Sequence, residues 1–223
     1  RSREDELPNG ALSVRYRFVH VLYQNALFAS LTPSRRVSLS ALAAESLLSA
    51  YGPRSSQIAV DLAQLFETAR DVPRAVEYLA IAADAAIRVL ANQEAALLAR
   101  RGLELLERQP ESEARLEREM SLLTTLGVAL GAMQGMASPE VGRVHARAYD
   151  LWKRLGARPS LFPIAYAQWT YRIVSGQLDV SLRIGNELLQ MAEVSGDRAM
   201  AVVANNCLGI TLHHLGNQRA AAE

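Results

Sequence analysis

Histidines and cysteines are the residues whose chemistry can be judged first, because their side chains bind metals and act as bases or nucleophiles. His213 and His214 are adjacent, and neighbours on a helix point about 100° apart, so they cannot chelate one metal as an i, i+4 pair could. His145 has no second histidine, cysteine or carboxylate at ligand spacing, and Cys207 is the single cysteine. The sequence therefore predicts no metal site and no intrachain disulfide.

A cluster of glutamates interleaved with Arg115 and Arg118 is the second place where acid-base chemistry could occur. This alternation is typical of a solvated helix start that is stabilised by i, i+3 and i, i+4 ion pairs. Catalytic carboxylate pairs need burial and opposed environments, and the pattern indicates neither, so we expect a chain that is not an enzyme. The glutamates are Glu111, Glu113, Glu117 and Glu119.

Aromatic side chains gather in the middle of the chain at Tyr166, Trp169 and Tyr171, with Trp152 shortly before them. Aromatic anchors commonly carry the affinity of peptide-binding grooves. The first three residues are therefore candidates for a partner-binding groove. Core packing between repeats is the alternative role, and it is favoured for the cluster because Trp152 continues an apolar stripe.

The elements that would position these residues are helices, since apolar residues recur with the helical period almost everywhere after residue 18. No segment with strand-like alternation competes with them. Helix starts are predicted at Thr32, Ser138 and Asp197, which are good N-cap residues, and about ten helices result. Two of the expected core stripes are Val141, Val144, Ala148, Leu151, Trp152 and Leu155, and Ala201, Ala204, Leu208, Leu212 and Leu215.

Two similar turns, at residues 175–177 and 215–217, lie 40 residues apart with a third turn at 195–197 between them. One pair of helices per roughly 40 residues is typical of helical repeat proteins. The pattern resembles the tetratricopeptide (TPR) family, both here and in an earlier pair with its turn at Arg70-Asp71. The earlier pair carries the family's small and apolar positions at Leu62, Ala63 and Phe66, then Ala75, Leu79 and Ala82. The resemblance implies an all-α fold over residues 55–223, in which antiparallel helix pairs stack as a TPR-like right-handed superhelix and the last repeat is truncated.

Residues 15–51 carry a different signature, which begins Arg15-Tyr16-Arg17-Phe18-Val19-His20. It resembles the end of the helical or winged-helix region of bacterial signal-transduction ATPases with numerous domains. The resemblance implies that residues 1–54 close an ATPase-side module. It also implies that His20 senses nucleotide in the intact parent, where related switch ATPases place a histidine against the β-phosphate of ADP.

The phosphate-binding P-loop string G-x-x-x-x-G-K-[ST] is absent from this sequence. We therefore expect no cofactor in this chain, and ATP or ADP would bind elsewhere in a longer parent. The chain has no initiator methionine and ends within a helical pattern, so we expect it to be a fragment of such a parent.

The formal net charge is +1, and charges of both signs are scattered along the chain. This distribution argues against direct nucleic-acid binding, and no apolar run is long enough to span a membrane. We expect a cytoplasmic protein-protein interaction scaffold that is the sensor segment of an ATPase-type signalling or transcriptional regulator. Its partner would be a protein, a peptide or the parent's own ATPase domain. A free-standing TPR adaptor that binds peptides is the alternative.

Overall fold

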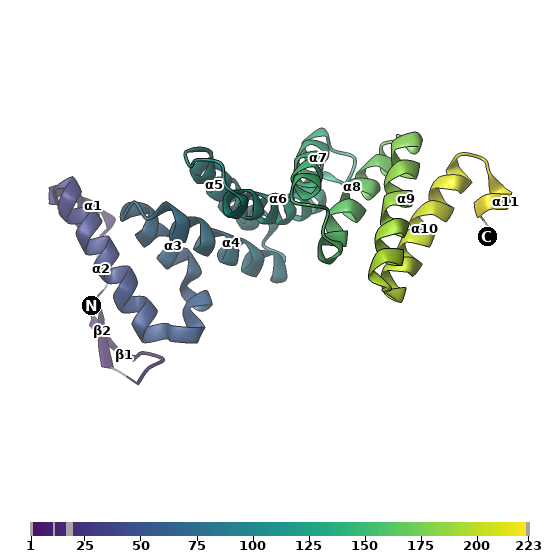
Figure 1. Ribbon diagram of the computed structural model, residues 1–223. Helices are drawn as coiled ribbons and strands as arrows, with labels where there is room; N and C mark the ends of the chain where they lie inside the picture. The colour runs from purple at the N-terminus through teal and green to yellow at the C-terminus, as the bar shows by residue number, and fades with distance from the viewer. Residues whose placement is uncertain (1, 11, 17–19, 222–223) are drawn as a thin grey trace.

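A computed structural model of the chain describes residues 2–10, 12–16 and 20–221. The described part is an elongated row of helices, preceded by one β-hairpin that projects from the row at its N-terminal end (Figure 1). The elements are β1 (Ser2–Glu6), β2 (Leu12–Tyr16), α1 (Val21–Ser30), α2 (Pro33–Tyr51), the 3-10 helix η1 (Gly52–Ile58), α3 (Ala59–Thr68), α4 (Val72–Arg88), α5 (Asn92–Glu107), α6 (Glu113–Gln134), α7 (Pro139–Arg154), the 3-10 helix η2 (Pro159–Leu161), α8 (Phe162–Val174), α9 (Leu178–Ser195), α10 (Arg198–His214) and α11 (Gln218–Ala221).

The predicted helical class is confirmed from Val21 onward, and the hairpin is the exception that periodicity did not predict. Strands β1 and β2 pair antiparallel, with Ser2 opposite Tyr16 and Glu6 opposite Leu12. Among the described residues, no helix is both long enough and apolar enough to cross a lipid bilayer.

Helix starts and turns follow local sequence rules. The side chains of Thr32, Ser138 and Asp197 cap α2, α7 and α10, as predicted, by accepting hydrogen bonds from backbone N–H groups in the first turn. The turns at Gly176 and Gly216 have the same form. In each, the glycine takes a positive φ, and the next residue donates its N–H back to the carbonyl five residues earlier.

The core runs along the row, because each helix from α3 to α10 packs against the next. The stripe on α7 is confirmed: Val141, Val144, Ala148, Leu151 and Trp152 are all buried, and only Leu155 is partly exposed. The predicted stripe on α10 is wrong in detail. The buried residues are Ala204, Cys207 and Thr211, whereas Leu208 and Leu212 are half-buried and Leu215 is 41% exposed in the turn after the helix.

Contacts beyond nearest neighbours divide the row into two layers. Helix α4 also packs against α6, and α8 touches α10, so the even-numbered helices share one side of the row. Polar side chains bridge the same pairs: Thr125 on α6 donates to Asp84 on α4, and Trp169 on α8 donates to Thr211 on α10. Helices α5 and α7 lie along the opposite, upper edge of the row in Figure 1.

Candidate binding groove on the even helices

A hollow of about 480 Å³ opens in the even layer between α6 and α8, next to the end of α4. Its size falls within the range of about 300–1,000 Å³ that is usual for ligand pockets. The chain between α7 and α8, residues 155–161, is longer than the other connections from α3 to α10, and its 3-10 helix η2 lines the hollow. Polar groups at the rim come from Asp84, Glu117, Ser121, Thr125 and Arg158, and the apolar lining includes Met120, Leu161 and Ile164.

Asp84 is the residue with unused binding capacity in this hollow. The buried Thr125 hydroxyl donates a hydrogen bond of 2.7 Å to Asp84 Oδ1, which fixes the carboxylate at the rim. Asp84 is itself exposed, and among the described residues no cationic side chain pairs with it. A carboxylate offers about four acceptor positions, so most of them face solvent.

Arg158 closes the opposite rim. Its backbone carbonyl accepts a hydrogen bond of 3.2 Å from the indole of buried Trp152, and this bond anchors the start of η2. Its guanidinium donates to Glu117 Oε1 and to Glu113 Oε1, both at 3.0 Å. Two carboxylates therefore already balance the arginine charge, and the rim as a whole is acidic.

The three aromatic residues predicted to line a groove take different positions. Trp169 is buried, and its indole donates to Thr211 Oγ1 at 3.1 Å, so it packs between α8 and α10. The ring of Tyr171 lies against Gly142 on α7, where it fills the space above a residue without a side chain. Tyr166 is 40% exposed and stacks on Trp169. Of the three, Tyr166 presents an accessible ring.

Spacing shows which exposed residues share the face of the hollow. Val128 lies one helical turn beyond Thr124, and Tyr166 lies one turn beyond Pro163, and both Thr124 and Pro163 line the hollow. Val174 lies eleven residues after Pro163, which is about three helical turns and places it on the same side of α8. We name this surface, from Asp84 on α4 through Ser121 and Val128 on α6 to Tyr166 and Val174 on α8, the even-helix face.

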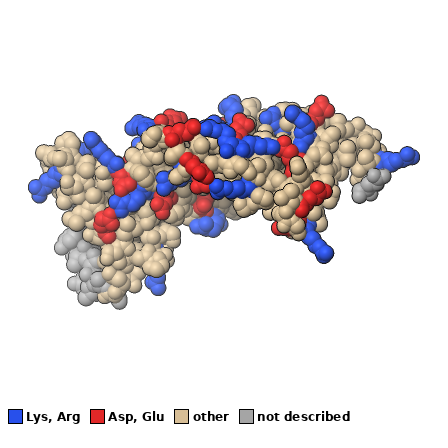
Figure 2. Space-filling model, viewed as in Figure 1, with Lys and Arg blue, Asp and Glu red and all other residues tan. Residues whose placement is uncertain are grey.

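The even-helix face loses its charges beyond the hollow. No Asp, Glu, Lys or Arg occurs in α6 after Glu119, and α8 has one, Arg172, which donates to Gln177 in the following turn. The neighbouring odd helix α7 is charge-rich by comparison, with Glu140, Arg143, Arg147, Asp150, Lys153 and Arg154. In the view of Figure 2, cationic and anionic side chains alternate over the upper part of the molecule and form no block of one sign.

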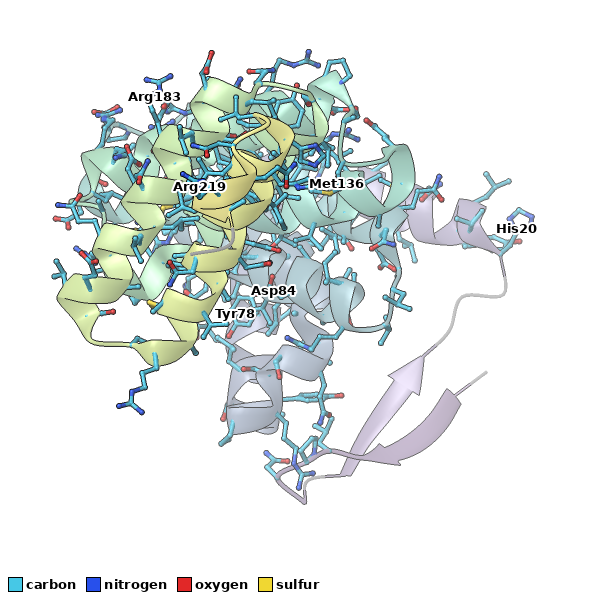
Figure 3. All side chains as sticks on the ribbon, turned by 90° about the vertical axis from the view of Figure 1, so that its right-hand side faces the viewer. His20, Tyr78, Asp84, Met136, Arg183 and Arg219 are labelled. Carbon is cyan, nitrogen blue, oxygen red and sulfur yellow. The ribbon has the colours of Figure 1, made fainter. Side chains whose placement is uncertain are left out.

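His20 lies apart from this face. It is the exposed N-cap of α1, and its Nδ1 accepts a hydrogen bond of 3.2 Å from the backbone N–H of Leu22. Figure 3 shows it at the edge of the molecule, separated from Asp84. The preceding signature residues 17–19 lie outside the described residues. The second ring nitrogen of His20 has no partner within the described part of the chain.

Helix α1 itself is an unusual element. It contains no charged residue, and its apolar side chains are exposed on all sides, including Val21, Leu22, Tyr23, Leu27 and Phe28. It makes little contact with the other described elements. A helix that is apolar all round is normally buried, so this surface is chemically suited to being covered.

The remaining candidate residues have structural surroundings. His145 is buried against Gly127, and burial lowers the pKa of its imidazole below the ordinary 6.5. Cys207 is buried, and burial raises the pKa of its thiol to about 12. His213 is exposed and bonds to Gln218. Within residues 2–10, 12–16 and 20–221, no group of three or more His, Cys, Asp or Glu side chains could hold a metal ion.

The residue pattern did not point to Asp84, Thr125 or Arg158 as functional residues. One local signal was present, because Asp84 is the single charged residue in the otherwise apolar stretch from Tyr78 to Ile87.

No known protein-family model matches this chain, and a search of curated proteins finds no match either.

Proposed function

We propose that this chain is a helical repeat scaffold that binds a peptide segment of another protein along the even-helix face. The observation that carries the proposal is the distribution of charge and exposure on that face. Accessible Val128, Tyr166 and Val174 lie on uncharged surface next to a hollow of suitable size, while α7 is densely charged. Exposed apolar surface with a polar rim is typical of protein interaction sites.

The repeat spacing supports a TPR-like superhelix as the geometry of the scaffold. Bridges between even helices join residues 41 and 42 apart, namely Thr125 to Asp84 and Trp169 to Thr211. We take the repeat unit to be roughly 40 residues long and to start at α4. Each bridge then links two positions that are one repeat apart. In such stacks each unit buries its neighbour's apolar face and leaves one extended surface for a partner.

A random peptide library displayed on phage would test the proposal directly. We expect selection against the purified chain to yield peptides whose binding is lost when Val128 is changed to Asp, because a charge would then stand on the uncharged face. The matched control is Leu97→Asp on α5, a residue that is also exposed but lies on the odd side of the row. Equal loss in both variants, or failure to select any peptide, would refute the proposed binding face.

We also propose that residues 1–54 belong to the ATPase-side module of a cytoplasmic signalling or transcriptional regulator. Exposure of the all-apolar helix α1 supports this proposal, since such a helix needs a covering partner. This proposal can be tested by precipitating the native protein from its cells and determining its size and peptide content by mass spectrometry. Peptides with a P-loop would justify measuring ADP affinity in a His20→Ala variant. A product of about this chain's 24.4 kDa would leave the free-standing adaptor instead.

A further inference from the structure

We propose that the hollow beside Asp84 receives a lysine or arginine side chain of the bound segment. The inference rests on the proposed function and specifies what the even-helix face recognises. It draws on three features of the hollow, which are a carboxylate with free acceptor positions, a rim arginine whose charge is already balanced, and an apolar lining.

The carboxylate of Asp84 is oriented by a hydrogen bond and has open acceptor positions for a cation. The 2.7 Å bond from Thr125 orients Oδ1 and occupies one acceptor position, and the remaining positions are open. Arg88 follows one turn later on α4, and in the described part of the chain the bond recorded for Asp84 is the one from Thr125, not an ion pair with Arg88. An incoming ammonium or guanidinium group would therefore make a charge-assisted hydrogen bond without displacing an existing pair.

The guanidinium of Arg158 is not free to bind an anion in the hollow. Both of its terminal nitrogens donate to glutamates, one to Glu117 and one to Glu113, so an incoming carboxylate or phosphate would have to break these bonds. It would also face the negative charge of Asp84. The electrostatics of the rim therefore favour a cation over an anion.

The lining explains why the cation should be carried on a long side chain. Met120, Leu161 and Ile164 present apolar surface below the polar rim, and lysine and arginine have methylene stems that pack on such surface while the charged head reaches a polar group. A purely apolar side chain would remove water from Asp84 without replacing its hydrogen bonds, which is unfavourable. A metal ion is disfavoured, since the described residues assemble no group of three ligands there.

The experiment uses fluorescein-labelled peptides taken from the phage selection on the unmodified chain. We expect a recurrent Lys or Arg among them, and replacement of that residue by norleucine should weaken binding, measured by fluorescence anisotropy, about tenfold. Asp84→Asn should weaken the parent peptide by a similar factor, because Thr125 can still donate to the amide oxygen while the charge is gone. Combining both changes should add little further loss, as expected for two partners of one contact.

Glu77→Gln is the matched control, since it removes a carboxylate from an exposed position of the same helix outside the hollow. It should leave the peptide affinity within about twofold, and the urea midpoint of Asp84→Asn should show that the variant folds. If peptides bind the even-helix face but lack a basic residue, or bind Asp84→Asn unchanged, this inference is wrong while the scaffold stands. If no peptide binds at all, both the proposed function and this inference are wrong.

Discussion

Replacing Gly142 on α7 with alanine should destabilise the protein, and the sign of the effect should reverse when Tyr171 is also changed to alanine. A Cβ atom added at Gly142 would lie 2.7 Å from Tyr171 Cε1 and nearer still to Cζ. Ordinary carbon contacts are about 3.5–4 Å. The ring must therefore move away from α7 to make room.

The magnitude follows from two opposing terms. Overpacking costs about 1–3 kcal/mol, and alanine in a helix interior gains back about 1 kcal/mol over glycine. A net loss of about 1 kcal/mol is expected for Gly142→Ala in the natural background. In a Tyr171→Ala background the clash is absent, so the same change should stabilise the protein by up to about 1 kcal/mol.

Urea denaturation of the four proteins in this cycle, followed by far-UV circular dichroism, supplies the free energies of unfolding. Fluorescence of the buried Trp152 and Trp169 provides a second probe, and the two transitions must coincide before the energies are compared. Gly209→Ala on α10 is the control, because the nearest atom to its added Cβ is a carbonyl oxygen at 3.4 Å and little clash is expected. A loss from Gly142→Ala that persists without the tyrosine ring would refute the steric explanation.

Three further outcomes follow from other parts of the structure. Leu90 takes a positive φ of 59° and is 81% exposed, so Leu90→Gly should stabilise the protein by about 0.5–1 kcal/mol in thermal or urea unfolding, and a loss would contradict the strain. His145 has a lowered pKa in the folded state, so full stability holds above its unfolded pKa near 6.5 and declines as the pH falls below it. This decline should be shallower in His145→Leu when urea midpoints are compared at about pH 7.5 and pH 5.5, whereas an equal decline would exclude His145 as the cause. Cys207 should resist thiol reagents in the native protein, given its burial and its pKa of about 12, and should react on unfolding. Rapid native labelling would show that α10 opens readily.

Local features were well predicted from the sequence. The caps at Thr32, Ser138 and Asp197 and the turns at Gly176 and Gly216 depend on residues close to one another in the chain, so their chemistry can be read directly. The hairpin was missed because Ser2–Glu6 is a charged segment without alternating apolar residues, and its pairing with Leu12–Tyr16 is a contact between separate segments.

The buried stripe on α10 shows why burial was harder to predict than helix position. Thr211 is fully buried because its hydroxyl accepts from the Trp169 indole and donates to the Cys207 carbonyl, so it carries no unpaired polar group. Helical periodicity alone assigned Leu208, Leu212 and Leu215 to the core instead. The partner that makes Thr211 tolerable in the interior lies 42 residues away and could not be identified from periodicity.

The sequence by itself therefore determined the helical class and most helix boundaries, because these arise from interactions over a few residues. Tertiary structure alone decided which helices share a layer, and with that the position of Asp84 beside Thr125 and the hollow between α6 and α8. The physical reason is that a helix's own pattern states which face is apolar, but not which neighbour will cover that face or where the stack will leave a gap.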